Sequence, residues 1–274
     1  MFKNDSEVKL SIITVVFNNR EGLCRTLESV KRQTFCDFEQ IVIDGGSTDG
    51  TLEEIKKYES QIANFRWISE KDNGIYNAMN KGIKMAKGEY CYFLNSDDYI
   101  AAPNTLEKIF EKAKDADIIY GNLAIRKGEN LKKVMCFSSK LTRFSFYRSK
   151  VAIHHQASLI KRELFLKHGF YREDIKIISD WIFFFEIVML HKASTQYVNI
   201  IFAVFLSGGV SYRQNDVKNR EIQIKQDILS SFFSPQELAN YKKREKKRKH
   251  PIRIWVDKIY MRILLIKNIS KIRI

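Results

Sequence analysis

Proline, glycine and cysteine are all scarce in this chain of 274 residues, which contains 3, 12 and 4 of them. So little proline and glycine excludes a collagen-like or low-complexity protein, and a hydrophobic content of 45% supports a sizeable core. The cysteines are widely spaced and form no C-x-x-C pair, which fits neither a zinc site nor a disulfide framework. We therefore expect a reducing, cytoplasmic environment.

Long apolar segments are missing as well. No run approaches the roughly 18 apolar residues that cross a bilayer. The first residues, MFKNDSE, lack the apolar stretch of a signal peptide. We expect a protein that is neither integral to a membrane nor secreted by that route.

Positive charge is in clear excess. Lys and Arg number 47 against 32 Asp and Glu, which gives a net charge of +15 and favours an anionic partner. Residues 242–274 carry +11 of this charge, so residues 1–241 are nearly balanced at +4. The basicity belongs to a C-terminal appendage.

Residues 1–120 alternate between strand and helix patterns. The run LSIITVVF at residues 10–17 is typical of a strand buried on both faces. After it, Leu23, Leu27 and Val30 lie on one stripe of a predicted helix at residues 20–33. The alternation continues with predicted strands at residues 38–44, 65–69, 89–94 and 117–120, and predicted helices at residues 51–58, 74–87 and 105–113. This repetition predicts an α/β fold with a doubly wound, mostly parallel sheet and helices on both faces.

The pattern is less regular after residue 120. It predicts a hairpin within residues 122–137, helices at residues 162–168 and 179–191, and a strand at residues 198–206. We expect one domain over residues 1–212, followed by a helical extension over residues 213–274.

Polar residues follow several predicted strands, at the edge where parallel α/β sheets bind ligands. Phe17 follows the first strand, Asp44 ends the second, and the sequence NSDD at residues 95–98 follows the fourth. The adjacent carboxylates Asp97 and Asp98 repel each other unless a cation is near, and oxygen ligands favour Mg²⁺ or Mn²⁺. Simpler roles stay open, since Asp44 could cap a turn and the paired aspartates could precede a helix.

These motifs together resemble the family 2 inverting glycosyltransferases of GT-A fold, of the kind that assembles bacterial glycans. The likeness runs through SIITVVFNN from residue 11, QTFCDFEQIVIDGGSTDGT from residue 33, SEKDNGIYNAMNKGI from residue 69 and GEYCYFLNSDD from residue 88. Later likenesses are HHQASLIKRELF from residue 154, ISDWIFFF from residue 178 and GGVS from residue 208. The resemblance implies a nucleotide-binding half at residues 1–120 and an acceptor-binding half at residues 121–212.

The resemblance also implies roles for single residues. It makes Phe17 the ring beside the nucleotide base, and Asp44 the acceptor of the base's imide N–H, a donor that uracil has. Asp72 and Asn80 lie in a segment that surrounds the nucleotide-sugar in such enzymes, with a helix cap and a packing contact as the alternatives.

The NSDD sequence takes the place of the family's D-x-D motif. Asn95 replaces the first Asp, Ser96 follows it, and Asp97 and Asp98 are left to divide the contacts with ribose and with Mn²⁺ or Mg²⁺. Which aspartate binds the metal is open.

Asp180 stands where the family has its catalytic base, although Ser179 replaces the Glu that often precedes that base. A carboxylate at a helix start is also stabilised in its ionised form by the helix dipole, as a base requires, although a plain N-cap would look the same. His154 and His155 are candidates for acceptor or phosphate contacts. Gly208 and Gly209 are candidates for a loop over the diphosphate, or for a simple turn.

The extension combines the basic block KKREKKRK at residues 242–249 with apolar residues at helical spacing between Ile252 and Leu264. This pattern predicts a basic amphipathic helix that lies on an anionic membrane surface. A packing or homo-oligomer helix is the alternative. The chain has no recognised nucleic-acid motif, so we expect no nucleic-acid partner.

Together with the site residues, the resemblance implies a metal-dependent, inverting hexosyltransferase with a UDP-linked sugar donor. Its acceptor would be a hydroxyl of a glycan or lipid-linked glycan, at the cytoplasmic face of the membrane. The alternatives are a nucleotidyltransferase, for which residues 17–20 make a poor phosphate-binding loop, and a non-catalytic nucleotide-binding scaffold.

Overall fold

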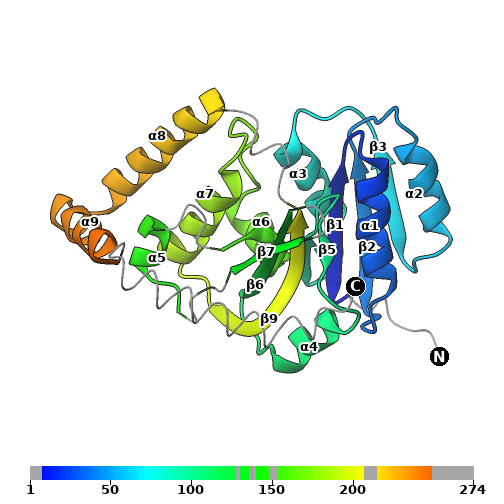
Figure 1. The fold of residues 1–274 in the computed structure, drawn as a ribbon, viewed down its shortest axis with the longest axis horizontal. Coiled ribbons are helices and arrows are strands. Elements are labelled where there is room, and N and C mark those ends of the chain that lie inside the picture. The colour runs from blue at the N-terminus through cyan, green and yellow to red at the C-terminus, as the bar shows by residue number, and fades with distance from the viewer. Residues whose placement is uncertain are drawn as a thin grey trace.

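The computed structural model of the chain describes residues 8–127, 130–135, 137, 140–148, 153–206 and 215–248. Strands and helices alternate from residue 10 to residue 93 (Figure 1). The strands are β1 (Leu10–Val16), β2 (Phe38–Asp44), β3 (Phe65–Ser69), β4 (Tyr90–Phe93), β5 (Tyr99–Ile100), β6 (Ile118–Lys127), β7 (Asn130–Met135), β8 (Ser158–Lys161) and β9 (Thr195–Leu206). The helices are α1 (Arg20–Lys31), α2 (Thr51–Glu59), α3 (Ile75–Met85), α4 (Thr105–Lys112), α5 (Arg143–Arg148), α6 (Arg162–His168), α7 (Ser179–Phe185), α8 (Asn215–Phe232) and α9 (Pro235–Arg248), with a short 3₁₀ helix η1 (His155–Ala157) and a π-helical turn η2 (Glu186–Leu190).

In the described part of the chain, the strands form one sheet of nine strands in the order β3-β2-β1-β4-β8-β6-β9-β5, with β7 paired to β6. Strands β3, β2, β1 and β4 run parallel, and β6 and β9 form a long parallel ladder. Strand β8 is antiparallel to both of its neighbours. The predicted α/β fold with a mostly parallel sheet is confirmed. The predicted hairpin is also present, since β6 and β7 pair with Lys127 opposite Asn130.

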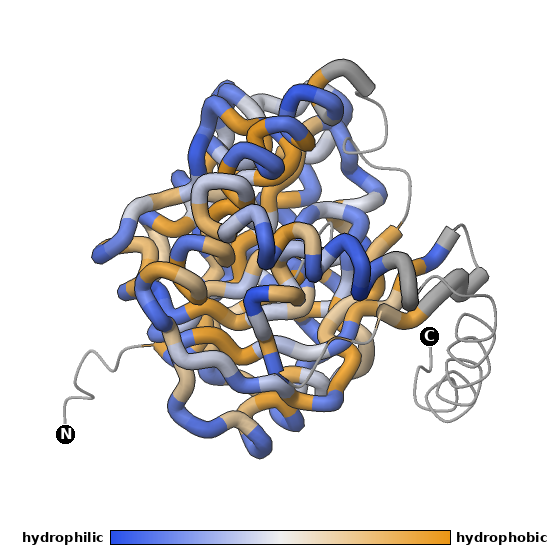
Figure 2. The backbone as a smooth tube through the Cα atoms, turned by 90° about the vertical axis from the view of Figure 1, so that its left-hand side faces the viewer, coloured by the Kyte–Doolittle hydropathy of each residue, from blue (hydrophilic) through white to orange (hydrophobic). Residues whose placement is uncertain are grey.

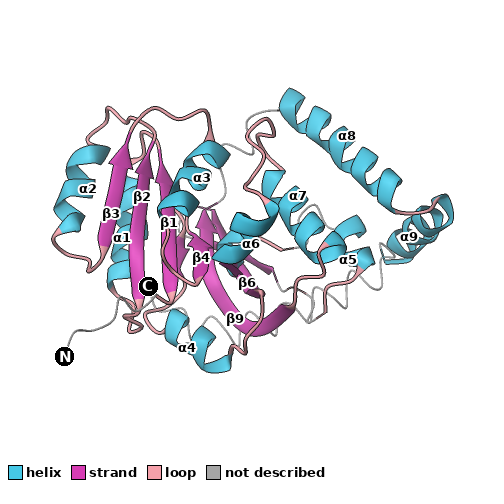
Figure 3. Ribbon diagram, turned by 180° about the vertical axis from the view of Figure 1, so that it is seen from behind, coloured by secondary structure: helices cyan, strands magenta, loops and turns pink. Residues whose placement is uncertain are grey.

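Strand β1 shows how the core is divided between two layers. Ile13 and Val15 pack with α3, α6 and α7, whereas Leu10, Ile12 and Val16 pack with α1, α2 and α4. Successive side chains of a strand point to opposite faces, so one apolar run supplies both layers. In Figure 3, α3 and α6 lie in front of the sheet and α1 lies behind it. Figure 2 shows hydrophobic stretches through the middle of the molecule and hydrophilic turns at its rim.

Helix α8 shares a core with the domain that precedes it, although it lies in the predicted extension. Leu229 and Phe233 are buried in the same cluster as α7, and the rings of Phe232 and Phe185 lie 5.0 Å apart between centroids. Among the helices that the structure describes, none is long and apolar enough to cross a membrane. The domain boundary at residue 212 stays a prediction, and residues beyond 248, including the predicted amphipathic helix, lie outside the described residues.

Candidate active site

The carboxyl ends of β1, β2, β3 and β4 meet at one edge of the sheet. Val16 pairs with Asp44, Asp44 pairs with Ser69, and Ile13 pairs with Phe93 in the parallel ladders. The loops that follow these strands therefore leave the sheet side by side. This register brings together motifs that lie far apart in the sequence.

Phe17 and Asp72 lie next to each other above Gly45. Phe17 is 61% exposed, which is unusual for a large aromatic side chain directly after a buried strand. A Cβ atom at Gly45 would lie 2.5 Å from Asp72 Oδ2 and 3.2 Å from Phe17 Cδ2, so only glycine lets these side chains approach. An exposed ring beside a carboxylate offers a stacking surface and a hydrogen-bond acceptor, which together suit a nucleoside.

Asp44 lies beneath this platform and is fully buried. Its carboxylate accepts hydrogen bonds from the Ser47 backbone N–H at 3.1 Å and the Ser69 hydroxyl at 2.6 Å. These bonds give it the turn-capping role that the sequence left open. Direct contact with a nucleotide base stays a prediction.

Asn80 is also bonded within the fold. Its amide donates to the Tyr171 carbonyl at 2.8 Å and to Glu173 Oε1 at 2.9 Å, and it accepts from the Tyr171 N–H at 3.0 Å. The side chain therefore ties α3 to the segment before α7. Its predicted contact with the donor stays a prediction.

The two aspartates of the NSDD sequence have different surroundings. Asp97 is half-buried, adopts a positive φ of 85°, and forms an ion pair with Arg25. Asp98 points inward, where it accepts from Gln156 Nε2 at 3.3 Å and from the Leu206 N–H at 3.4 Å. Burial, against only these two long hydrogen bonds, raises the pKa of Asp98 to about 8. At neutral pH the metal-free protein therefore holds a proton on Asp98.

Two amide oxygens, one in the NSDD sequence and one on the glutamine that contacts Asp98, lack hydrogen-bond partners. Within the described residues, Asn95 Oδ1 and Gln156 Oε1 are buried without a hydrogen-bond partner. Carboxylate and amide oxygens are the ligands that Mg²⁺ and Mn²⁺ prefer. Over the same residues no group of three His, Cys, Asp or Glu is arranged to hold a metal. The residues fit a divalent ion that takes part of its coordination from substrate and water.

Asp180 is at the centre of a buried hydrogen-bond network. Its Oδ1 accepts from the Trp181 N–H at 2.8 Å and lies 3.1 Å from the Tyr76 hydroxyl, while Oδ2 lies 2.9 Å from His155 Nδ1. Burial alone would raise the pKa of Asp180, but the hydrogen bond from His155 and the electrostatic effect of its ring outweigh burial and hold that pKa below its ordinary value. Asp180 is therefore ionised at neutral pH, as a general base must be.

His155 joins Asp180 to the NSDD sequence. Its Nε2 lies 3.3 Å from Asn95 Nδ2, while its Nδ1 contacts Asp180. An ionised carboxylate can only accept hydrogen bonds, so His155 Nδ1 donates to Asp180 and the ring links Asp180 to Asn95. His154 packs its ring near Phe137, and its predicted contact stays a prediction. Gly208 and Gly209 lie outside the described residues.

Sequence reasoning missed Tyr76 and Gln156. Tyr76 lies on the apolar stripe of α3, so its spacing predicts only a core residue. Gln156 follows the two histidines in a segment where no periodic pattern assigns it a direction. Both residues fall inside the motifs that carried the family resemblance, which was the one signal that marked them.

Known proteins match this chain in sequence and in fold. The model of the family described as glycosyl transferase family 2 matches residues 11–169. A PGL/p-HBAD biosynthesis glycosyltransferase of Mycobacterium bovis is 32% identical over 206 residues, which cover 73% of this chain and 78% of the relative. The poly(ribitol-phosphate) beta-N-acetylglucosaminyltransferase TarP of Staphylococcus aureus is 37% identical over 134 residues, or 46% of this chain and 40% of TarP.

Solved structures match the fold. S. aureus TarS 1–349 in complex with UDP-GlcNAc has a TM-score of 0.64 at 20% identity and covers 85% of this chain and 70% of its own. The mannosyltransferase PcManGT from Pyrobaculum calidifontis, in complex with GDP-Man and Mn²⁺, has a TM-score of 0.56 at 19% identity over 74% of this chain and 58% of its own. This likeness confirms the GT-A type fold. Because the family model matches more than half of the chain and the mycobacterial relative is 32% identical, the chain belongs to glycosyl transferase family 2.

Proposed function

We propose that the chain is a metal-dependent, inverting hexosyltransferase that moves a sugar from a UDP-sugar to a hydroxyl of a glycan or lipid-linked glycan. The observation that carries this proposal is the convergence, at one sheet edge, of an exposed stacking ring, paired aspartates and an ionised buried carboxylate. TarS in complex with UDP-GlcNAc and the name of TarP support a UDP-linked donor and a glycan acceptor.

The nucleoside would stack on Phe17 beside Asp72. The ring is 61% exposed, so it offers a surface on which a base can stack. Asp72 accepts from the Gly74 N–H at 2.8 Å through Oδ1, so its Oδ2 can accept from a ribose or base donor. Asp44 would support this surface from below through Ser47 and Ser69.

Mn²⁺ or Mg²⁺ would be held by Asp97 and Asp98, with Asn95 and Ser96 lining the same turn. A bound divalent ion neutralises negative charge on the leaving diphosphate. The Mn²⁺ in the PcManGT complex supports this cofactor class. Because Asp98 is buried and protonated while Asp97 is half-exposed, Asp97 is the ligand that a metal meets first.

Asp180 would act as general base. A carboxylate has about four lone-pair positions; the Trp181 N–H takes one on Oδ1 and His155 takes one on Oδ2, while the Tyr76 hydroxyl lies 3.1 Å from Oδ1. The remaining position, on Oδ2, can take the proton of the acceptor hydroxyl. As that oxygen bonds to the anomeric carbon, the bond to the diphosphate breaks, and the diphosphate leaves with the electron pair. Attack from the face opposite the leaving group inverts the configuration.

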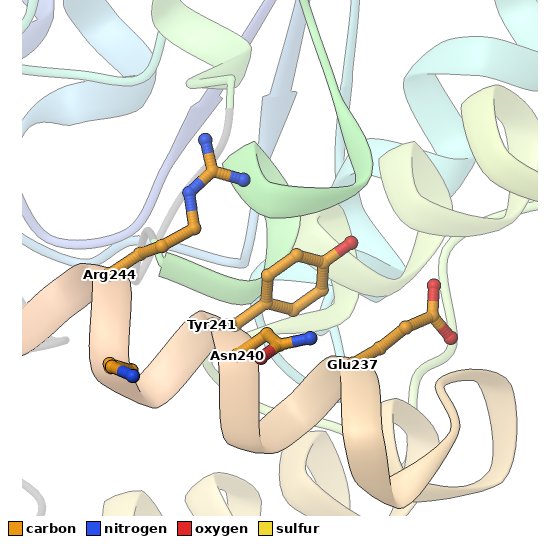
Figure 4. A pocket seen from close by; sticks show the side chains of 5 residues that line it. Glu237, Asn240, Tyr241 and Arg244 are labelled. Carbon is orange, nitrogen blue, oxygen red and sulfur yellow. The ribbon is translucent and has the colours of Figure 1, made fainter.

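We propose that residues 242–274 hold the enzyme at the cytoplasmic face of an anionic membrane. At the described start of this segment, Lys242, Lys243 and Arg244 on α9 are exposed. A hollow of about 400 Å³ lies against the same helix (Figure 4), lined by Glu237, Asn240, Tyr241, Lys243 and Arg244. Helix α9 lies at the opposite end of the molecule from β1–β3 (Figure 1), so membrane contact there leaves the strand ends open.

A donor panel tests the proposed function. Purified protein is incubated with individual UDP-sugars and other nucleotide-sugars, with Mn²⁺ or with chelator, and slow hydrolytic release of the nucleotide is measured without acceptor. We expect release from at least one UDP-sugar that depends on Mn²⁺. Nucleotide binding without release from any donor, with or without a glycan acceptor, would favour the non-catalytic scaffold instead.

A further inference from the structure

Glu221 is a buried carboxylate on α8, outside the residues that the family model matches. It is only 3% exposed. Its Oε1 accepts from the Lys176 N–H at 2.5 Å, and its Oε2 accepts from the N–H groups of Ile177 at 2.8 Å and Ile178 at 3.0 Å. Three consecutive backbone N–H groups thus converge on one side chain, which a helix much later in the chain supplies.

These N–H groups lie directly before α7. Ile178 is the N-cap residue of α7, and its apolar side chain cannot accept a hydrogen bond. The N-terminus of a helix carries unpaired N–H groups and partial positive charge, which a nearby carboxylate stabilises. Glu221 therefore holds, from another helix, the segment that leads into α7.

Asp180 is the second residue of α7 and depends on the same segment. The backbone of Ile177 is held on both sides, because its N–H donates to Glu221 and its carbonyl accepts from the Tyr76 hydroxyl at 2.8 Å. That hydroxyl lies 3.1 Å from Asp180 Oδ1. A shift of the Ile177 peptide would therefore move both the backbone of Asp180 and the tyrosine that contacts its carboxylate.

Helix α8 is well placed to transmit this restraint. Lys225, one turn after Glu221, lies over the Trp181 ring at 4.2 Å from its centroid. One turn further, Leu229 is buried in the cluster that contains α7. From Glu221 onward the helix is thus held against α7 and the segment before it, so that Glu221 has a firm support.

We propose that Glu221 is a positioning residue for the transfer reaction, fixing the backbone before α7 so that Asp180 meets the acceptor hydroxyl. This inference rests on the proposed function of Asp180 as base. Groups in an active site must be held within about 0.5 Å of the productive geometry, and a displacement near 1 Å can cost about 100-fold in rate. The extension thereby completes the catalytic site of the domain it follows.

Glu221→Gln is the direct test. The amide has the same size but replaces one accepting oxygen with an NH₂ group that faces a backbone N–H. With the UDP-sugar found by the donor panel and water as the acceptor, we expect kcat for UDP release to fall at least about ten-fold, while KM for the donor and the affinity for UDP stay within about two-fold. The matched control is Asp227→Asn, which removes the same charge from an exposed position of α8, where the carboxylate contacts Gln223. The control should keep wild-type kcat.

Ile109→Ala separates positioning from stability. Ile109 is buried on α4 in the apolar cluster that excludes α7 and α8, so the variant should lower the melting temperature without loosening α8. Activity is compared well below the melting temperature of every variant. If Glu221→Gln and Ile109→Ala lose activity in proportion to their lost stability, or if Glu221→Gln keeps wild-type kcat, Glu221 is only structural.

Two further measurements keep the inference testable. If Glu221→Gln does not fold, Glu221→Asp, which keeps the charge and withdraws it by one methylene, is measured for the same split between kcat and KM. An unchanged kcat in that variant would overturn the inference. A wild type that is inactive with every donor would count against the proposed function itself. The role of Glu221 alone would be rejected if the wild type is active, Asp180→Asn is inactive and Glu221→Gln is as active as the wild type.

Discussion

Asp98→Asn should change how the stability of the metal-free protein depends on pH. In the folded chain the pKa of Asp98 is about 8, against an ordinary value of 3.8, because the carboxyl group is buried. The folded state therefore holds this proton more tightly than the unfolded state does. The stability that Asp98 contributes is complete below about pH 4 and is lost as the pH rises through about 8.

The magnitude follows from the two pKa values. Between pH 5.5 and 8.5 the unfolded chain has already lost the proton while the folded chain loses most of it, so the free energy of unfolding falls by about 3 kcal/mol. For a chain of this size that corresponds to a drop in melting temperature of about 6–12 °C. Asparagine cannot ionise. It can keep both contacts if the Gln156 amide turns its unpartnered Oε1 toward the new NH₂ group.

The assay is thermal unfolding of the wild type and Asp98→Asn in chelator at pH 5.5, 7.0 and 8.5. The difference in the free energy of unfolding between the two proteins isolates the effect of Asp98 from that of other titrating groups. From pH 5.5 to pH 8.5 this difference should change by about 3 kcal/mol in favour of Asp98→Asn. Added Mn²⁺ should stabilise the wild type more strongly at pH 8.5, because a metal ligand must first lose its proton. Parallel pH curves for the two proteins would refute the buried, protonated Asp98. A Mn²⁺ effect that does not vary with pH would assign the metal to Asp97 alone.

Phe17→Ala should weaken UDP binding by about 5- to 150-fold, because stacking on an aromatic ring contributes about 1–3 kcal/mol per base. Isothermal titration measures the affinity, and the control is Phe170→Ala, which removes another exposed ring. Equal affinities of these two variants would remove Phe17 from the site. In chelator, Asp97→Ala should bind UDP with the affinity of the wild type, but Mn²⁺ should no longer increase that affinity. An increase in UDP affinity with Mn²⁺ equal to that of the wild type would exclude Asp97 as a metal ligand. Removing residues 242–274 takes away +11 of the charge and should abolish sedimentation with anionic liposomes while UDP binding persists. Added salt should weaken the binding of the full chain to liposomes. If the truncated protein unfolds, residues 242–274 pack against the rest of the chain instead of binding a membrane.

The sequence predicted the layers of this fold well, because apolar periodicity marks buried elements directly. Residues 10–17 and 38–44 were predicted as strands and form β1 and β2 within one residue. Strand β8 was missed, since so short a strand shows no period, and its antiparallel pairing with β4 depends on contacts between segments far apart in the chain. Where an element is short, tertiary contacts decide its structure.

The candidate site was predictable at the level of motifs but not of individual contacts. Asp97 and Asp98 are neighbours in the sequence, yet one forms an ion pair with Arg25 near the surface and the other is buried beside Gln156. The turn that separates them depends on the positive φ of Asp97, which no residue pattern announces. Glu221 had no signal at all, because it is one charged residue in a helix with many, and its partners are backbone groups of another segment.

The comparison of wild type with Asp180→Asn tests the central claim most directly. In the variant, the amide oxygen can still accept from the Trp181 N–H. Its NH₂ group can donate to His155 Nδ1 if the Asn95 amide turns its unpartnered Oδ1 toward Nε2, so the site should keep its shape. With the donor identified by the panel, the variant should bind UDP within about two-fold of the wild type and transfer sugar about 10²- to 10⁴-fold more slowly. Transfer at the wild-type rate by a folded Asp180→Asn protein would contradict the assignment of this residue as the base.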